Sequence, residues 1–116
     1  MPKNFIASKM VGLMYKLVFF VPATHCEQVK SAVFATGAGG QGHYGHCSWQ
    51  VLGQGQFLPL EGSRPFIGGQ GQLEVVDEYR VETLCAEECI HDVVTALKKA
   101  HPYEEPAYEI YQLASI

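Results

Sequence analysis

The alternation of apolar and polar positions predicts three strands in this chain. Residues 15–21 are apolar on both alternating sets and end at Pro22, which indicates a strand with both faces covered. Residues 73–84 place charged side chains on one parity and mostly apolar side chains on the other. Residues 107–113 alternate in a similar way and predict the last strand.

A fourth strand is predicted in the middle of the chain, over residues 47–57. Its first half, 47–52, has the composition of a strand, whereas Gly53 and Gly55 in its second half indicate a bend or a bulge. The next segment, 59–71, is rich in glycine and proline and is predicted to be a loop. Its apolar side chains predict that this loop is folded down onto the domain.

Apolar positions at the helical period predict two helices. The first follows Thr24 and Glu27, which have the spacing of a capping box, and Gly37 is placed to be its carboxyl cap. The second, over residues 87–100, has apolar side chains at i, i+3, i+4 and i+7. Its first turn is acidic and its last turn holds lysines, as the helix dipole favours. Pro102 ends this helix.

The order of the elements predicts the fold class. Strand, helix, strand, strand, helix, strand is the ferredoxin-like β-α-β-β-α-β arrangement of α+β domains, here with a Gly- and Pro-rich loop between the middle strands. Both helices cover one sheet face in that fold. Because residues 15–21 are apolar on both parities, a free monomer would expose a large apolar face. We therefore predict a homo-oligomer that packs sheet faces together, a trimer ahead of a dimer.

Length, charge and cysteine content narrow the possible functions. The 116 residues make one domain, and the formal net charge of −4 comes with scattered Lys and Arg, so nucleic acid is not an expected partner. The four cysteines do not form the pattern of a disulfide scaffold, which favours reduced thiols in a cytoplasmic protein. Cys85 and Cys89, near a predicted helix start, are either a reactive pair or ordinary partly buried residues.

Residues 1–13 differ from the rest of the chain. Their apolar positions continue into residues 17–21 and imitate the core of a signal peptide, but Lys16 interrupts the run. The run is also shorter than the about 20 residues that a membrane helix needs. We therefore expect residues 1–13 to be an N-terminal extension and residues 14–116 to form the single domain, without a membrane partner.

A glycine-rich segment over residues 37–49 carries the G-x-G-x-x-G spacing of dinucleotide-binding loops at Gly37, Gly39 and Gly42. In a dinucleotide fold these glycines follow a strand and open a helix. Here a predicted helix precedes them and a predicted strand follows, so we do not expect a dinucleotide site.

The same segment contains residue types that bind zinc or copper, namely His43, His46 and Cys47. Their spacing is not that of a structural zinc site. Structural roles compete with metal binding, since the glycines allow tight turns and Cys47 can be a small buried side chain. If a divalent metal binds, we expect His43 and His46 as its ligands, with a carboxylate from elsewhere.

Residues 101–106, His-Pro-Tyr-Glu-Glu-Pro, form the second candidate site. His101, Glu104 and Glu105 are able to supply acid–base or metal-ligand chemistry. The two prolines fix the backbone, so the segment can equally be a rigid connection that sets the register of the last strand. Arg64, in the predicted loop, is a candidate contact for an anion.

Several well-separated motifs carry a family resemblance. They lie, in order, at residues 37–39, 42–44, 46–48, 59–62, 65–68 and 101–108. They resemble the YqfO-type domain, which is inserted in many bacterial members of the NIF three-like dinuclear-metal family and also occurs as a small stand-alone protein. The resemblance covers residues 15–113. It implies a fold similar to the trimeric PII signalling proteins and the CutA copper-tolerance proteins.

The resemblance also limits the chemistry that we expect. The metal-binding histidines of full-length members lie in flanking domains outside the matched segment, so the resemblance argues against an enzyme. PII-like trimers bind ligands in clefts between subunits, and by that analogy residues 101–106 would line a cleft beside the glycine-rich segment. Gly40, Gln41 and His43 stand where the family would have His-Ile and Asn, so the ligand can differ in this protein.

The sequence thus predicts a non-catalytic oligomeric module that binds a small ligand or a partner protein at subunit clefts. The candidate ligand-binding residues are Gly39, Gly42, His43, Tyr44, His46, His101, Tyr103, Glu104 and Glu105. Two alternatives stay open. One is a divalent-metal-binding protein, and the other is a small hydrolase that uses Glu104 or Glu105.

Overall fold

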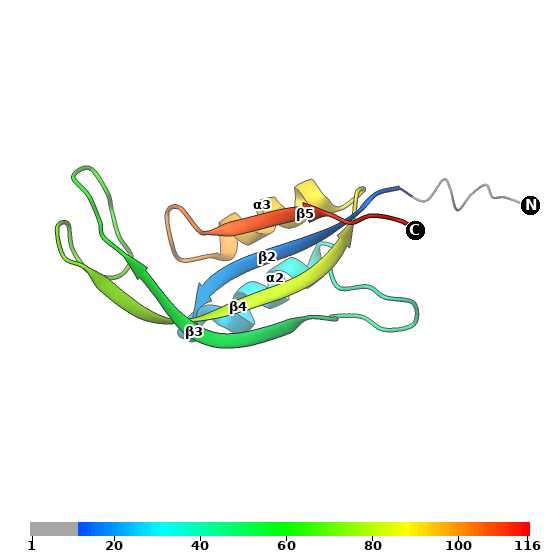
Figure 1. Ribbon diagram of the computed structural model, residues 1–116, viewed down its shortest axis with the longest axis horizontal. Helices are drawn as coiled ribbons and strands as arrows, with labels where there is room; N and C mark the ends of the chain where they lie inside the picture. The colour runs from blue at the N-terminus through cyan, green and yellow to red at the C-terminus, as the bar shows by residue number, and fades with distance from the viewer. Residues whose placement is uncertain (1–11) are drawn as a thin grey trace, which may run out of the picture.

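A four-stranded antiparallel sheet forms the centre of the computed structural model, which describes residues 12–116 (Figure 1). Its strands, in the order β3-β4-β2-β5, are β2 (Met14–Pro22), β3 (Trp49–Phe57), β4 (Glu74–Ala86) and β5 (Tyr108–Gln112). This is the strand order of a ferredoxin-like sheet, so the predicted fold class is confirmed. Most of the predicted extension over residues 1–13 lies outside the described residues.

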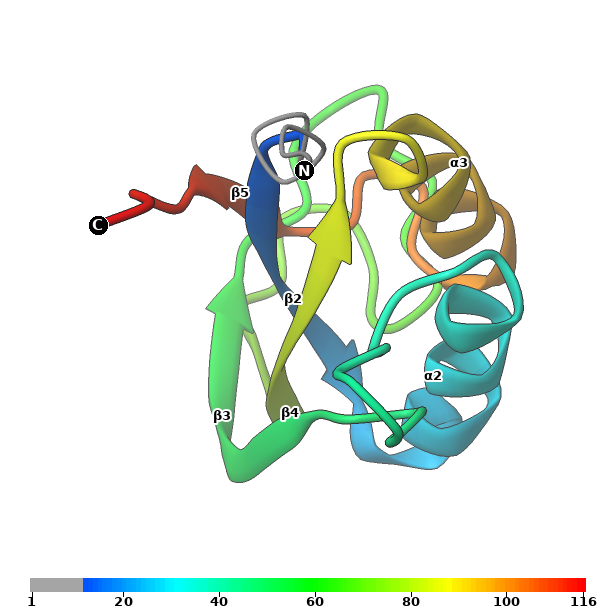
Figure 2. The same cartoon turned by 90° about the vertical axis from the view of Figure 1, so that its right-hand side faces the viewer.

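The two helices lie on one face of the sheet (Figure 2). They are α2 (Cys26–Ala35), which follows the short helix η1 (Ala23–His25), and α3 (Ile90–Ala100). One parity of β2 and β4 packs against the buried stripes of both helices. The largest core side chains are Leu17, Phe19, Val29, Val33, Val93 and Leu97. Among residues 12–116, neither helix has the length and apolar character needed to cross a membrane.

The predicted starts of both helices are wrong in detail. No capping box forms, because the Thr24 hydroxyl lies 2.8 Å from Nδ1 of the neighbouring His25, and the N-cap of α2 has no side-chain hydrogen bond. Helix α3 begins at Ile90 and not at residue 87. Strand β4 continues to Ala86 and residues 87–89 form a turn, in which the Glu87 N–H donates to the Leu13 carbonyl at 2.9 Å. The predicted acidic first turn therefore lies ahead of the helix.

Strand β3 pairs with β4 without interruption. The register runs from Trp49 opposite Glu82 to Phe57 opposite Glu74 with no residue skipped, so the predicted bulge is wrong. The ribbon of β3 does bend in this region (Figure 1). Gly55 has a packing reason to lack a side chain, because a Cβ at this position would collide with the Glu78 carboxylate.

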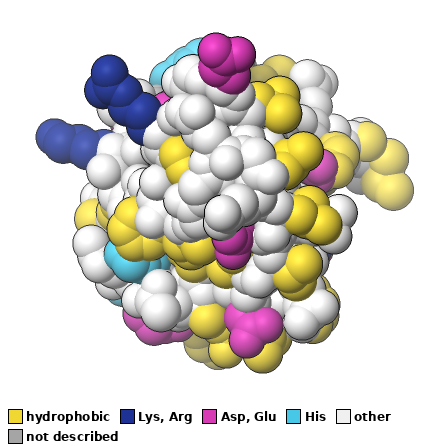
Figure 3. Space-filling model, turned by 90° about the vertical axis from the view of Figure 1, so that its left-hand side faces the viewer, with side chains coloured by type: hydrophobic (Ala, Val, Ile, Leu, Met, Phe, Trp, Pro, Cys, Tyr) yellow, Lys and Arg dark blue, Asp and Glu magenta, His cyan; other side chains and the backbone are white. Residues whose placement is uncertain are grey.

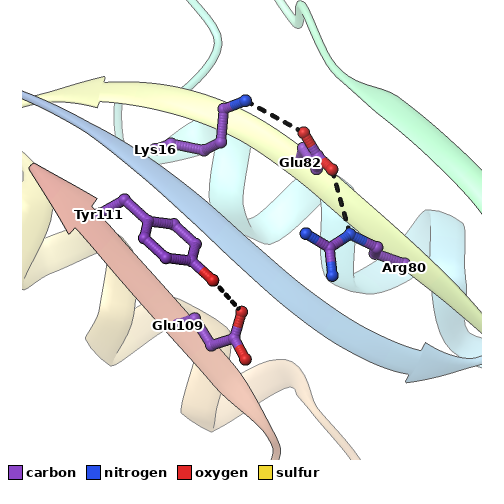
Figure 4. A network of polar contacts seen from close by, with 5 residues as sticks. All are labelled: Lys16, Arg80, Glu82, Glu109 and Tyr111. Atoms are coloured by element: carbon purple, nitrogen blue, oxygen red, sulfur yellow. Dashed lines mark hydrogen bonds and ion pairs between the residues drawn. The ribbon is translucent and has the colours of Figure 1, made fainter. Parts of the chain in front are cut away.

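The sheet face opposite the helices is covered by charged side chains. Lys16 Nζ lies 3.2 Å from Glu82 Oε1, and Arg80 Nε lies 3.1 Å from Glu82 Oε2 (Figure 4). Hydrogen bonds from Arg80 and Lys16 hold the pKa of the Glu82 carboxyl below its usual range. Beside this network Val18 has no exposed surface. The expectation that β2 would expose an apolar face is therefore wrong.

The exposed large apolar side chains of this face lie instead on the edge strands, two on β3 and Tyr111 on β5. Trp49 and Val51 are opposite Glu82 and Arg80, so they share the face of the charged network, and they are 59% and 44% exposed. We call these two residues the β3 patch. At the other edge, Tyr111 on β5 donates its hydroxyl to Glu109 at 2.6 Å (Figure 4).

His101 joins the end of α3 to β2. Its imidazole is buried, Nε2 lies 2.7 Å from the Phe20 carbonyl oxygen, and Nδ1 accepts the Tyr103 N–H at 3.1 Å. Because Nδ1 is an acceptor, the ring proton is on Nε2 and the imidazole is neutral. Burial lowers the pKa of His101, although the bond to Phe20 raises it.

Shortening Leu97 tests the core between α3 and the sheet. Leu97 is fully buried, so Leu97→Ala leaves a cavity and should lower the free energy of unfolding by about 2–5 kcal/mol. Lys99 is exposed on the same helix, and Lys99→Ala should change this free energy by less than about 0.5 kcal/mol. Urea denaturation followed by circular dichroism measures both. Equal losses in the two variants would contradict this packing.

The buried neutral state of His101 predicts a pH-dependent stability. The folded pKa is below that of the unfolded chain, so the unfolded chain binds more protons when the pH falls below about 6.5. The stability that the neutral, buried His101 contributes is fully present at about pH 7.5 and is lost as the pH falls. The urea concentration at the unfolding midpoint should therefore be lower at about pH 5.5 than at about pH 7.5. His101→Gln should reduce this pH dependence. His91→Gln, at an exposed position on α3, should leave it unchanged.

Candidate functional site

The loop between β3 and β4 and the segment between α3 and β5 lie at one end of the sheet (Figure 1). Between them is a pocket of about 650 Å³. We call it the Tyr103 pocket. Its walls come from residues 55–63, 65–66 and 103–105 and from Ala107, with Phe20 and Glu78 from the sheet. Two motifs that lie about forty residues apart in the sequence therefore share one cavity.

Hydrogen bonds hold the β3–β4 loop in place. The Gly71 N–H donates to the Pro59 carbonyl at 2.8 Å and closes the loop, and Pro59 is buried at its base. The Arg64 N–H donates to Glu104 Oε1 at 2.6 Å, which ties the loop to the segment after α3. The loop contacts the segment after α3, as predicted, through this polar contact. Two of its apolar side chains, Leu60 and Phe66, are 67% and 53% exposed and are not the buried anchors that were expected.

Tyr103 is the centre of an aromatic cluster. Its ring centroid lies 5.8 Å from that of Phe57, 6.5 Å from that of Phe66 and 4.9 Å from the imidazole of His101. The Tyr103 hydroxyl donates to Glu78 Oε2 at 2.9 Å. Burial raises the pKa of the Tyr103 phenol and the bond to Glu78 raises it further, so the phenol keeps its proton. Tyr103 therefore presents a fixed ring and a fixed donor.

The charged groups of the pocket are acidic. Glu61, Glu78, Glu104 and Glu105 line it, and none of the described residues in its wall is Lys, Arg or His. Figure 3 looks onto this end of the molecule and shows hydrophobic side chains beside Asp and Glu, with Lys and Arg visible only at the upper left edge. Arg64 contributes a backbone N–H to Glu104, and its side chain does not line the cavity.

The glycine-rich segment lies at the other end of the sheet (Figure 1). Gln41 and Tyr44 exchange backbone hydrogen bonds of 2.8 and 2.9 Å around Gly42, which has a φ of 59°. His43 and Tyr44 are exposed at this tight turn. Three of the predicted ligand-binding residues therefore sit together on one exposed turn.

Gly39 attaches this segment to the sheet. Its N–H donates to the Leu84 carbonyl at 2.8 Å and its carbonyl accepts the Cys47 N–H at 2.9 Å. It has a φ of 87°, and a Cβ would lie 3.0 Å from both the Cys47 nitrogen and the Phe34 ring. His46 stacks on Phe34 with centroids 4.9 Å apart. These contacts give Gly39 and His46 structural roles.

The structure separates the two predicted candidate segments within one chain. Residues 101–106 line the Tyr103 pocket or support it, while residues 37–49 lie at the far end of the sheet. Among residues 12–116, no group of three or more His, Cys, Asp or Glu side chains is arranged to hold a metal ion. A metal site that pairs His43 with His46 stays a prediction.

The cysteines of the described chain are free thiols. Cys85 lies on β4 in the core, where burial raises its pKa to about 11, with a further contribution from Cys89. A raised pKa reduces the thiolate fraction, so Cys85 does not have the lowered pKa of a reactive pair.

Sequence reasoning missed part of the pocket wall. Glu78 lies on the β4 parity that alternation marks as charged, and its pairing with Tyr103 depends on a contact across 25 residues. The sequence places Phe57 only at the end of a predicted strand, and Glu61 and Phe66 only in motifs of the predicted loop. The motif at residues 59–62 was the available signal, because it accompanied the motif at residues 101–108 in the family resemblance.

Comparison with known proteins identifies relatives. No family model matches the chain. It is 51% identical over 102 residues to a protein named GTP cyclohydrolase 1 type 2 homolog from Halalkalibacterium halodurans, covering 88% of this chain and 27% of that protein. It is 46% identical over 103 residues to the protein of the same name from Mycobacterium leprae, and this match covers 89% of this chain and 27% of that protein. The chain thus spans about a quarter of the length of these relatives.

Solved structures agree with these relatives. The Bacillus cereus protein related to NIF3 has a TM-score of 0.78 and 43% identity, over 90% of this chain and 27% of that chain. The divalent cation tolerance protein CutA from Archaeoglobus fulgidus has a TM-score of 0.63 at 13% identity, over 88% and 85%. GlnK of Bacillus subtilis, in a complex with ATP, has a TM-score of 0.58 at 14% identity, and the match covers 90% of this chain and 84% of GlnK. The last two show the shared fold alone.

The relatives and the NIF3-related structure match the same stretch of about a hundred residues. This chain therefore belongs to the YqfO-type domain family of NIF3-related proteins, with the PII- and CutA-like form of the ferredoxin-like fold.

Proposed function

We propose that this protein is a non-catalytic, oligomeric module that binds a small ligand in the Tyr103 pocket. The observation that carries the proposal is the pocket itself. Its volume of about 650 Å³ is within the range of small-molecule sites, and its wall combines aromatic rings with a few fixed polar groups. Three predicted ligand-binding residues, Tyr103, Glu104 and Glu105, lie in that wall.

The polar groups of the pocket support binding in preference to hydrolysis. The Ser63 hydroxyl donates to the Leu60 carbonyl at 2.7 Å, so it is not activated by a base. The Tyr103 phenol donates to Glu78, and both ring nitrogens of His101 are bonded to the backbone. Glu104 and Glu105 do line a cavity, but the nucleophile and base that hydrolysis needs are not paired among the described residues.

The exposed β3 patch supports oligomerisation. Trp49 is more than half exposed on a sheet face that no helix covers, and Val51 lies beside it on the same strand. An exposed tryptophan next to a paired charge network is typical of the centre of an interface. We propose that sheet faces pack together in a trimer, as the family resemblance implies. In such a trimer, a neighbour could bring its glycine-rich segment to the pocket.

Substitution in the β3 patch tests the assembly. The tag-free protein should be a trimer in native mass spectrometry, and Trp49→Glu should shift it to monomer, because the carboxylate would be buried against the neighbouring sheet. Leu73→Glu changes an apolar residue of similar exposure that lies outside the pocket wall, and it should leave the trimer intact. A wild-type monomer would refute the proposed assembly, and so would a trimer that survives Trp49→Glu.

Filling the cavity tests the ligand site. Ala107 is exposed and lines the pocket, so Ala107→Phe should place a ring in the ligand volume without disturbing the core. Native mass spectrometry of protein taken directly from cells should show a small-molecule mass on the wild type that this variant lacks. Ala114→Phe, outside the pocket wall, is the matched control and should keep it. A retained mass that persists in Ala107→Phe would place the ligand elsewhere.

A further inference from the structure

We infer that the Tyr103 pocket selects a small organic cation, an ammonium or amidinium group on an apolar body. This inference rests on the proposed function and adds the chemical class of the ligand. It depends on two features of the wall that do not depend on each other, namely its charge and its aromatic rings.

The first feature is uncompensated negative charge. Glu61 and Glu105 are exposed at the pocket and make no hydrogen bond or ion pair among the described contacts, while Glu104 accepts only the Arg64 N–H. Glu78 accepts the Tyr103 hydroxyl, a neutral donor. A cation entering this partly enclosed space would face several carboxylates at reduced dielectric, which strengthens the attraction compared with water.

The second feature is the aromatic lining. Phe20, Phe57, Phe66 and Tyr103 all contribute to the wall, and the rings of Phe57 and Phe66 are tilted by 59° and 48° to that of Tyr103. Tilted rings present faces from more than one direction, the arrangement that suits a cation. Phe20 already attracts one, since the Arg80 guanidinium lies 5.6 Å from its ring centroid. Arg80 is itself paired with Glu82 and does not line the pocket.

The same wall disfavours anions. A phosphate or carboxylate site needs Lys, Arg or free backbone N–H groups. The described wall has no basic side chain, and the Arg64 N–H next to it is already bonded to Glu104. An anionic ligand such as a nucleotide would meet repulsion from the glutamates without compensation from this chain.

Three probes of nearly identical shape test the charge preference directly. Benzamidine carries one positive charge at neutral pH, benzamide is neutral and benzoate carries one negative charge. Titration of ¹⁵N-labelled full-length protein should give saturable amide shifts with benzamidine at Phe57, Gly62 and Glu104, which line the pocket. We expect benzamide to bind at least about tenfold more weakly and benzoate not to shift these amides. Benzamidine binding should weaken as salt is added.

Charge-neutral variants identify the responsible groups. Glu61→Gln and Glu104→Gln keep the side-chain shape, and the amide introduced by Glu104→Gln retains an oxygen that can accept the Arg64 N–H. Each variant should weaken benzamidine binding by about two- to fivefold, and the double variant by about tenfold. Glu88→Gln makes the same change in net charge at an exposed residue outside the pocket, and it should leave the affinity unchanged.

The outcomes separate this inference from the proposed function. If benzamide or benzoate shifts the pocket amides as strongly as benzamidine, the preference for cations is refuted while the pocket stands as a ligand site. Equal affinity of benzamidine for the wild type and for the double variant would likewise refute the preference for cations and leave the pocket as a ligand site. If none of the three probes shifts these amides at about 10 mM, the preference for cations is refuted. The proposed function fails as well only under one further condition. Native mass spectrometry must also find no small-molecule mass on the wild type that is lost in Ala107→Phe.

Discussion

The central strand β2 has to be covered on both faces, and the two sides of the sheet meet this requirement in different ways. On the helix side, Leu17 and Phe19 are buried by α2 and α3, and burial of each such side chain contributes about 1.5–3 kcal/mol. On the other side, Val18 is also fully buried, and it lies opposite Glu82 on β4 and Glu109 on β5, on the face that carries the Lys16–Glu82–Arg80 network. Partly exposed ion pairs of this kind contribute at most about 1 kcal/mol each.

The burial of Val18 within the single chain removes the open face of β2 as an apolar surface for oligomer contacts. Because Val18 is already buried in the single chain, sheet faces that pack together would use the edge strand β3, with Trp49 and Val51, in place of β2. As an edge strand, β3 also presents one row of backbone groups that pairs with no other strand among residues 12–116. Assembly through β3 would therefore bury apolar surface and pair an exposed edge in the same step.

Some parts of this structure follow from sequence patterns and others do not. Strand β4 and helix α3 were predictable because each alternates or repeats strongly, so that Val81, Thr83, Val93 and Leu97 are buried as the pattern requires. The start of α3 was not, because strand pairing with residues far away in the chain decides where β4 ends. The capping box at Thr24 failed for a local reason, since the neighbouring imidazole takes the hydroxyl.

The candidate site shows the same division. Residues 101–106 were recognised from residue types, whereas their partner Glu78 reaches Tyr103 only because Gly55 has no side chain in the way. That arrangement involves three elements and leaves no trace in any local pattern. The segment has two interpretations, a rigid connection or a binding site, and the proposed function combines them. His101 is fixed by its hydrogen bonds to Phe20 and Tyr103. Pro102, between His101 and Tyr103 in the sequence, further restricts the backbone. Tyr103 is thereby held in place before any ligand arrives, which reduces the entropy cost of binding.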